Sequence, residues 1–567
     1  MRIKIKQHYQ IARRFIGIVI LSLLLLPLSA QPGWVKKATK SVFTLKTFAN
    51  DGSLIGSSNG FFVGNNGEAI SNFTPFKNAA KAVIIDAAGK EYAVTAIMGA
   101  NDTYDVAKFR VAASKTQPLI VASSIAPIGS SVWLLPYHET KNILSGQVRK
   151  AENFMTDYAY YTIAMQMQEN QVSCPLLNDA GEVIGLMQQP ASQQDTLSYA
   201  VSACFADSLK ITGMSLNDQT LKLTKIKKDI PNDLQNAMLM LFMASSSTDS
   251  ATYVGLVDEV ISKFPDAPEG YIQRAQLSAA SNRFAAADED MQKAIKVADP
   301  KDDAHFNYAR MIYNKMIFQS HIPFEPWTLD KALREIQEAN AIKPLSTYRQ
   351  MEANIRFAQK DYNEAYNIFY SLATTEDMNK AENWYGAVRC KEMLKDTTAM
   401  LALLDSTMNT FNKPYLKEAA PYLWARANAK LDAGKFRGAV TDMNEYEQLM
   451  AANINDRFYY IRHQAEVEGR LFQQALNDIT RAIQLNPSET LYYAEKASLQ
   501  IRVGQYDEAL STAEECIALD SQSSDGYLFK GLAQCLKGNK KDGIQNLTKA
   551  KELGDPQADG LIEKYSK

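Results

Sequence analysis

The second half of the chain repeats a pattern every 34 residues, and this period limits the folds that it can adopt. Tyrosines recur at this spacing, and small residues follow them at matching distances. The residues in register are Tyr459, Tyr493 and Tyr527; Ala475, Ala509 and Gly543; and Ala482, Cys516 and Ala550. Only small side chains let two helices approach closely, and an aromatic ring fills the gap beside them. The period therefore predicts pairs of helices stacked in an array.

This pattern resembles the tetratricopeptide repeat, in which a proline closes each unit, as Pro487 does here. Less regular copies of the pattern precede it. The resemblance implies an all-α helical solenoid over residues 267–567, with about eight or nine repeats of this kind in the helical part. Residues 208–266 are expected to form a connector and a degenerate helical repeat. Their apolar run Met238–Met243 favours a buried cap over a Met-rich binding surface.

Residues 31–207 are rich in β-branched side chains and are interrupted by turn sequences, which is typical of an all-β fold. Asn65-Asn66-Gly67 and the run at residues 87–90 predict two hairpin turns. The expected strands cover residues 41–48, 68–72, 82–86, 91–98, 105–111, 131–135, 146–150, 158–165 and 182–187. Together with residues 60–63, which lead into the first of these turns, they form two groups, and two groups of about six strands suit a double β-barrel.

Several of these segments resemble the HtrA-like branch of the trypsin-like serine proteases, in the family's order. Residues 60–72 resemble its first hairpin, which ends in Leu-Thr-Asn-x-His, and residues 82–111 resemble the strands that lead to its catalytic aspartate. Residues 175–185, from Pro-Leu-Leu to Val-Ile-Gly, resemble the segment after its catalytic serine, and residues 196–203 resemble its last strand. The resemblance implies an N-terminal trypsin-like double β-barrel over residues 31–207.

The family's catalytic triad maps onto residues that mostly lack its chemistry. The aspartate position falls on Asp105, the histidine position on Thr74 and the serine position on Val172. Threonine is no general base at neutral pH, and valine has no nucleophilic group. Ser173 and Cys174 stand where the family has two glycines, which puts its oxyanion hole in doubt. The resemblance thus implies a degenerate protease domain that is not an enzyme.

A shifted alignment would make Ser173 the nucleophile, and this alternative stays open. It requires a base, and His138 is the one histidine of residues 31–207. His138 lies in a segment that resembles the family's second lobe and not the position of the base. The alternative function is therefore a trypsin-like serine endopeptidase that uses Ser173 with an unorthodox base, while the repeats recruit substrate. In a third hypothesis the barrel only stabilises or spaces the repeats.

The N-terminus has the pattern of a secretory signal peptide over residues 1–30. Five basic residues precede an apolar run over residues 15–26, and Ala30 offers a cleavage site before Gln31. The apolar run is short for a membrane span, and no other candidate span follows. We expect an exported protein, periplasmic or extracellular, with no membrane span after signal removal.

Charge, motifs and cysteines exclude several functions. Removing the five basic residues of the signal segment from the 61 in the chain leaves 56 against 63 acidic residues, a net of −7, so nucleic acid is not an expected partner. No metal-binding or nucleotide-binding motif is present, and we expect no metal and no cofactor. Five cysteines are too few for a disulfide scaffold, although Cys174 and Cys204 are a conceivable pair.

The leading functional hypothesis is binding of a protein or peptide on the concave face of the repeats. Polar residues on the first helix of a repeat, away from its packing positions, are the candidates for contact with that partner. They are Arg462, Glu466, Glu495, Gln500, Lys530 and Gln534. His463 stands where a packing residue is expected, which predicts a partly buried structural histidine. The sequence thus predicts a protein-binding scaffold that joins a degenerate trypsin-like domain to tetratricopeptide repeats.

Overall fold

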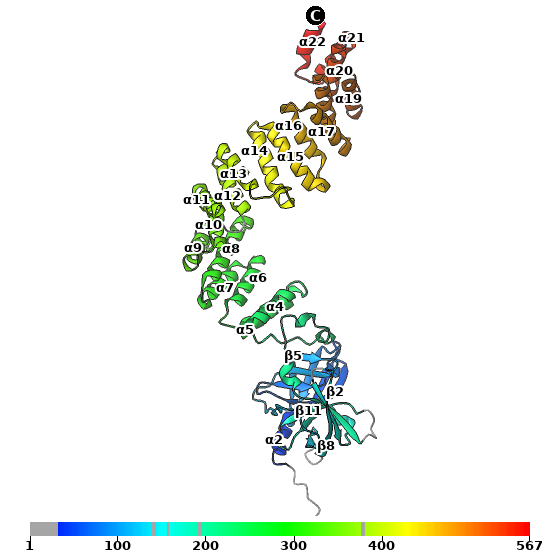
Figure 1. Ribbon diagram of the computed structural model, residues 1–567, viewed down its shortest axis with the longest axis vertical. Coiled ribbons are helices and arrows are strands. Elements are labelled where there is room, and N and C mark those ends of the chain that lie inside the picture. Colours follow the sequence, from blue (N-terminus) through cyan, green and yellow to red (C-terminus); the bar gives the residue numbers. More distant parts are fainter. Residues whose placement is uncertain (1–31, 138–142, 156–157, 191–195, 376–379) are drawn as a thin grey trace, which may run out of the picture. The chain divides into compact units, whose positions relative to one another are not determined.

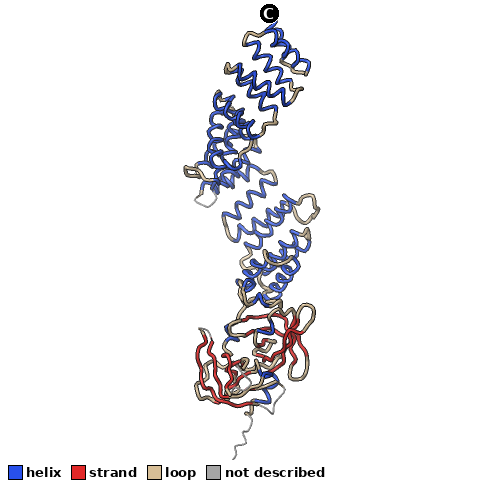
Figure 2. The backbone as a smooth tube through the Cα atoms, turned by 90° about the vertical axis from the view of Figure 1, so that its right-hand side faces the viewer, coloured by secondary structure: helices blue, strands red, loops and turns tan. Residues whose placement is uncertain are grey.

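A computed structural model describes residues 32–137, 143–155, 158–190, 196–375 and 380–567 (Figure 1). The chain divides into two compact units, residues 1–297 and 298–567, and each is described by itself. In the described residues all strands belong to the first unit, and the helices from α4 onward follow them in the chain (Figure 2). The predicted signal segment and His138 lie outside the described residues.

The first six strands form a closed antiparallel barrel in the order β1-β2-β3-β6-β5-β4. Gly67 and Gly89 both have φ of +81°, and each lies in one of the two turns predicted from the sequence. A Cβ on Gly67 would lie 2.2 Å from the carbonyl oxygen of Val111, so this turn requires glycine. The strands are β1 (Val42–Phe48), β2 (Leu54–Phe62), β3 (Glu68–Ser71), β4 (Lys81–Ile85), β5 (Glu91–Asn101) and β6 (Val106–Val111).

The other six strands form a second closed barrel in the order β10-β11-β12-β9-β8-β7. The strands are β7 (Ser131–Leu134), β8 (Leu144–Phe154), β9 (Tyr158–Ala164), β10 (Pro175–Leu177), β11 (Val183–Met187) and β12 (Leu197–Ser202). The predicted double β-barrel is confirmed. The strand β10 was not predicted, because three residues are too few to show an alternating pattern.

Aromatic packing fills the first barrel, and a shared core joins the two barrels. Phe43 packs against Phe62 and Phe109, with ring centroids 4.9 and 6.1 Å apart. Between the barrels, Phe61 and Val106 from the first barrel share a buried cluster with Phe205 and residues of the second barrel. This common core brings the loop after β3, the start of β6 and the loop before β10 together.

Short helices border the barrels. They are α2 (Val35–Ala38), η1 (Thr39–Ser41), η2 (Thr74–Phe76), η3 (Glu169–Gln171), α3 (Phe205–Ser208), η4 (Ser215–Asn217) and η5 (Leu221–Leu223). The connector that follows η5 pairs with β5 as a short parallel bridge. Ile97 donates its N–H to the Lys227 carbonyl at 2.8 Å, and Asp229 donates to the Ile97 carbonyl at 2.9 Å. Arg110 of β6 binds the carboxylate of Asp229 at 2.9 Å, so the connector is fixed to the barrel.

Four helices complete the first unit: α4 (Leu234–Ala244), α5 (Ser250–Lys263), α6 (Pro268–Ala280) and α7 (Phe284–Val297). The apolar run that was predicted to be a buried cap lies in α4 and is divided between two environments. Met240 and Leu241 are buried, whereas Leu239 and Phe242 are exposed. The run therefore has one packed face and one open face.

The second unit consists of consecutive helices that pack in pairs along the chain. They are α8 (Asp302–Phe318), α9 (Leu329–Ile342), α10 (Ser346–Ala358), α11 (Tyr362–Thr374), α12 (Lys380–Met393), α13 (Thr397–Met408), η6 (Lys417–Ala419), α14 (Ala420–Asp432), α15 (Phe436–Met450), η7 (Ala451–Asn453), α16 (Asp456–Glu468), α17 (Phe472–Leu485), α18 (Thr490–Arg502), α19 (Tyr506–Leu519), α20 (Ser524–Leu536), α21 (Lys540–Glu552) and α22 (Ala558–Ser566). The predicted all-α region, consistent with a solenoid, is confirmed. Within the described residues, no helix is long and apolar enough to span a bilayer.

The repeating small residues lie at the contacts between paired helices, as predicted. Ala475 and Ala509 are fully buried. A Cβ on Gly531 of α20 would lie 2.7 Å from the carbonyl oxygen of Gly543 in α21, so the two backbones touch there. This close approach is the reason that only small residues recur at these positions.

Candidate functional site

The candidate catalytic positions meet where the two barrels join. Asp105 lies directly before β6, with a left-handed backbone (φ +50°) that turns its carboxylate back toward the end of β3. Asn72 and Phe73 follow β3, and η2 begins at Thr74. From the second barrel, η3 and the residues that precede β10 bring Ser173 to the same place.

The carboxylate of Asp105 is engaged by the chain that follows β3. Its Oδ1 accepts hydrogen bonds from the backbone N–H groups of Phe73 at 3.0 Å and Thr74 at 2.6 Å. Its Oδ2 accepts from Nδ2 of Asn72 at 3.3 Å. Asp105 therefore fixes the turn through which the family's histidine position passes. Thr74 contacts Asp105 only through its backbone N–H group, and Thr74 is exposed to solvent.

Asn72 connects Ser173 to Asp105. Its Oδ1 accepts hydrogen bonds from Oγ of Ser173 at 2.8 Å and from Oγ of Ser58 at 2.6 Å. In return, the backbone N–H of Asn72 donates to Oγ of Ser173 at 3.2 Å. The carboxamide orientation follows from its partners, because the carboxylate of Asp105 accepts only and needs the NH₂ group. Ser173, Asn72 and Asp105 thus form one continuous hydrogen-bonded line.

This line has the order of a serine protease triad with a carboxamide in the middle. A histidine imidazole can take the hydroxyl proton of serine and later return it. A carboxamide oxygen is a neutral acceptor with no comparable basicity, so Asn72 orients the hydroxyl of Ser173 without activating it. Ser173 is fully buried, and Val172 packs partly buried against the core of the second barrel.

Backbone donors around Ser173 are already used within the protein. Ser173 donates its N–H to the Met187 carbonyl at 2.9 Å, and Val172 donates to Glu169 at 3.3 Å. Cys174 donates to the Gln171 carbonyl at 3.2 Å. An oxyanion hole needs N–H groups that point at the developing negative charge. These three donors are not available for that purpose in this structure.

Ser173 has φ of +63°, a left-handed backbone that favours glycine. The resemblance stated above places it at the first of two glycine positions, and this backbone conformation agrees with that alignment. Asn72 was not among the residues singled out from the sequence. Its place in the pattern Ser71-Asn72-Phe73-Thr74, two residues before the lost histidine, is the one available signal.

The five cysteines are all free thiols in the structure. Cys174 is fully buried, and burial raises the pKa of its thiol to about 12. The sulfur of Cys204 faces the carbonyl of Ala122 at 3.9 Å. Cys174 and Cys204 therefore do not form the conceivable pair here. In the described residues no group of three or more His, Cys, Asp or Glu side chains is placed to hold a metal ion.

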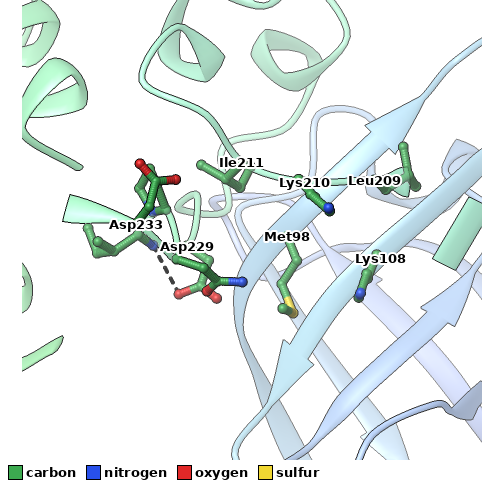
Figure 3. A pocket seen from close by; sticks show the side chains of 10 residues that line it. Met98, Lys108, Leu209, Lys210, Ile211, Asp229 and Asp233 are labelled. Carbon is green, nitrogen blue, oxygen red and sulfur yellow. Dashed lines mark hydrogen bonds between the residues drawn. The ribbon is translucent and has the colours of Figure 1, made fainter. Parts of the chain in front are cut away.

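A second candidate site is a cavity of about 120 Å³ beside the connector (Figure 3). Lys108 and Met98 of the first barrel face Lys210, Asp229 and Asp233 across it. Three of these charged side chains already have partners. Lys108 donates to the carbonyl of Ala206 at 2.5 Å, and burial lowers the pKa of its ammonium group. Asp229 binds Arg110, and Asp233 caps α4. The cavity is therefore part of a charged seam that holds the connector on the barrel.

Three residues proposed as partner contacts are buried within the helices. Arg462 forms a two-bond pair with Asp478, at 2.6 and 3.0 Å, and also binds Glu447 at 2.6 Å. Glu466 and Gln500 are buried, and each has a buried oxygen without a hydrogen-bond partner. Burial, reinforced by the nearby Asp478, raises the pKa of Glu466 to about 8.

The other three proposed contacts are half-buried at the surface. Lys530 and Gln534 of α20 line one groove of about 640 Å³ together with residues of α21. Lys530 pairs with Glu514 at 3.0 Å, and Gln534 accepts from Asn546 at 2.7 Å. The sixth, Glu495, accepts from Tyr460 at 3.5 Å. Of the six proposed contacts, Lys530 and Gln534 thus lie together in one groove.

The side chain of His463 in α16 is buried. Its residue is 1% exposed, and its Nδ1 lies 2.9 Å from the carbonyl oxygen of Ala475. Burial lowers the pKa of its imidazole. It is a buried packing residue, in agreement with its position in the repeat.

Comparison with known proteins supports the identity of the β-domain. Residues 58–186 match the family described as a trypsin-like peptidase domain. Among solved structures, the chain is similar to the active form of the Rv3671c protease of M. tuberculosis. The two are 17% identical, with a TM-score of 0.28, over 32% of this chain and 85% of that one. A serine endoprotease from Yersinia pestis is 14% identical, with a TM-score of 0.27, over 31% of this chain and 62% of its own.

Other relatives include proteins named for tetratricopeptide repeats. Human DnaJ homolog subfamily C member 7 is 26% identical over 208 residues, or 35% of this chain and 40% of its own. The small glutamine-rich tetratricopeptide repeat-containing protein 2 of Saccharomyces cerevisiae is 27% identical over 95 residues, or 17% and 28%. The chain spans well under half the length of these relatives. A trypsin-like domain and a tetratricopeptide-like helical region are therefore joined in one chain.

Proposed function

We propose that this chain is an exported protein-binding scaffold whose trypsin-like domain does not hydrolyse peptides. The observation that carries the proposal is the line Ser173–Asn72–Asp105, in which a carboxamide stands between the hydroxyl and the carboxylate. The site keeps the connectivity of a triad and lacks the group that moves the proton. It holds the two barrels together at the place where the family does its chemistry.

The large contribution that a general base makes to peptide hydrolysis supports this proposal. Proton transfer by a positioned base contributes about 10²–10⁴-fold to a reaction of this kind, and triad members act as a unit. Ser173 is also fully buried, and its hydroxyl donates to Oδ1 of Asn72 and accepts from the backbone N–H of Asn72. A peptide carbonyl would have to displace these contacts before it could reach the hydroxyl. Both effects act against catalysis.

The helical region supports a binding role. Arrays of packed helix pairs offer an extended surface for peptides or partner helices and carry no chemistry of their own. Two of the relatives are named for the tetratricopeptide repeat, and we propose that the concave face of this array holds a protein or peptide partner. The connector, fixed on the first barrel by Arg110, would keep the barrel attached to the array.

Export completes the proposal. The n-region, apolar run and small-residue site of residues 1–30 support removal of a signal peptide before Gln31. Binding would then take place in the periplasm or outside the cell.

The catalytic part is tested by intact-mass analysis after exposure of the purified protein to a serine-directed fluorophosphonate. We expect no mass shift in the wild-type protein, while chymotrypsin in the same tube is labelled completely. Circular dichroism of the same sample establishes that the protein is folded. A stoichiometric shift that the Ser173→Ala variant abolishes would contradict the proposal and favour a serine endopeptidase acting through Ser173.

A further inference from the structure

A cleft of about 240 Å³ lies between α12, α13 and α14 of the second unit. Val388, Met400 and Leu404 contribute apolar side chains to its lining. Tyr385 and Trp424 are the aromatic residues in its lining. Small-molecule pockets usually measure about 300–1,000 Å³. A cleft of this size suits a single long side chain better than a cofactor.

The two aromatic rings are held in place by neighbours outside the cleft. Trp424 packs against Tyr446 and Phe458, with ring centroids 5.2 and 5.9 Å apart. Tyr385 packs edge-to-face on Tyr422 at 5.3 Å. Since both residues remain half-buried, they present fixed aromatic surface to an occupant.

The charged residues in the lining of the cleft are both acidic: Glu392 and Asp432. Glu392 lies in the last turn of α12, and Asp432 is the last residue of α14. A helix has a partial negative charge at its C-terminal end, so each carboxylate adds to a potential that is already negative. Asn428 offers a further polar group in the same lining.

These two carboxylates are exposed and, within the described part of the chain, have no hydrogen-bond or ion-pair partner. Cations on the same helices are engaged elsewhere. Lys391 lies over the ring of Tyr366 at 4.3 Å and pairs with Asp396, and Arg426 is held by Asp442 and Asp405. The cleft therefore has negative charge and aromatic surface but no internal cation.

We propose that this cleft binds a lysine or arginine side chain from an extended segment of the partner protein. The apolar lining residues would cover the aliphatic stem and Trp424 would face the cation, while Glu392 and Asp432 would bind the charged end. An apolar side chain would leave the carboxylates unpaired, and an acidic one would be repelled. The inference rests on the proposed function, because it assigns a partner chemistry to the same helical array.

The test measures fluorescence anisotropy of labelled peptides with the full chain. The probe is a fluorescein-labelled peptide of alanine, leucine and glycine with one central arginine; its counterparts carry citrulline or glutamate there. We expect the arginine peptide to bind about tenfold more tightly than the citrulline peptide, and the glutamate peptide to bind most weakly. The double variant Glu392→Gln/Asp432→Asn should abolish the preference for arginine, and Trp424→Leu should reduce it severalfold.

A matched control removes two exposed carboxylates from other helices, as Glu338→Gln/Glu508→Gln, and should bind like the wild type. The inference is overturned if the arginine and citrulline peptides bind equally, if the cleft variants keep the preference, or if none of the peptides binds at about 1 mM. Binding that ignores the central residue overturns the cleft and leaves the binding role of the repeats standing. The proposed lack of hydrolytic activity is tested separately, by the fluorophosphonate mass shift.

Discussion

At the scale of single residues, one carboxamide decides what the junction of the barrels can do. Asn72 accepts from the hydroxyls of Ser173 and Ser58 and donates to Asp105, so it satisfies three buried or half-buried polar groups at once. Buried polar groups are costly when they lose a partner. The residue that joins the Ser173 hydroxyl to the Asp105 carboxylate therefore also stabilises the junction.

Replacing Asn72 by alanine should lower the free energy of unfolding of the barrels by about 2–4 kcal/mol, because the Ser173 hydroxyl and the Asp105 carboxylate lose a partner in a buried site. Hydrogen exchange of peptides from residues 68–76 during urea titration measures this locally, since the whole chain has several domains. Thr74→Ala, at an exposed side chain in the same turn, should change stability by less than about 0.5 kcal/mol. Equal effects of the two substitutions would refute the proposed role of Asn72.

Glu466 gives the helical region a dependence on pH. Its pKa is raised from 4.5 to about 8 in the folded state, chiefly by burial. The folded state therefore holds a proton that the unfolded chain releases above pH 4.5. The stability that Glu466 contributes should be fully present below pH 4.5 and should be lost, by on the order of a few kcal/mol, as pH rises toward 8. Glu466→Gln should flatten this slope in thermal melts at pH 5, 6, 7 and 8; an unchanged slope would contradict the assignment.

At the scale of helices, an arginine–aspartate pair recurs between the two helices of a repeat. Arg274–Asp290 and Arg426–Asp442 are both two-bond pairs sixteen residues apart, as is the pair of Arg462. In each case the remaining Nη binds a carboxylate of the preceding helix: Asp258, Asp405 or Glu447. Each arginine thus links three consecutive helices, in addition to the close helix contacts that the small residues allow.

The inner and outer carboxylates of such a link should differ in their effect on stability. Asp442 is 2% exposed and binds both Arg426 and Lys430, so Asp442→Ala leaves Lys430 without its ion-pair partner and Arg426 with Asp405 alone, and it should cost about 3–5 kcal/mol. Asp405, on the same arginine, is 61% exposed, and Asp405→Ala should cost less than about 1 kcal/mol. Hydrogen exchange of α14 and α15 under denaturant distinguishes them. Similar losses in both variants would show that burial does not control the link.

Most of the fold could be predicted from helix and strand periodicity in the sequence, whereas the partners of individual side chains could not. The 34-residue period and the turns at Gly67 and Gly89 correspond to elements of the structure. Strand β10 was too short to show a pattern. The burial of Arg462 and the role of Asn72 depend on residues distant in sequence, such as Asp478 and Ser173. No local pattern encodes such contacts, so the candidate site could be located but not assembled from the sequence.

At the scale of the whole molecule, the chain joins a trypsin-like barrel domain to a helical array with an acidic aromatic cleft. The proposed export of this pair makes a direct prediction. Protein recovered from outside the cytoplasm should begin at Gln31, and intact mass should show the loss of residues 1–30. Replacing Ala30 by a bulky residue such as phenylalanine should block this cleavage. Recovery of a chain that keeps residues 1–30 would contradict the proposed export.

The absence of hydrolysis is the central claim, and turnover of fluorescein-labelled casein tests it most directly. Wild-type protein and the Ser173→Ala variant, purified side by side, are incubated with the substrate for a day at several pH values. The account predicts that both release fluorescence at the rate of the buffer blank. Release by the wild type that the Ser173→Ala variant lacks would contradict the account and identify Ser173 as a working nucleophile.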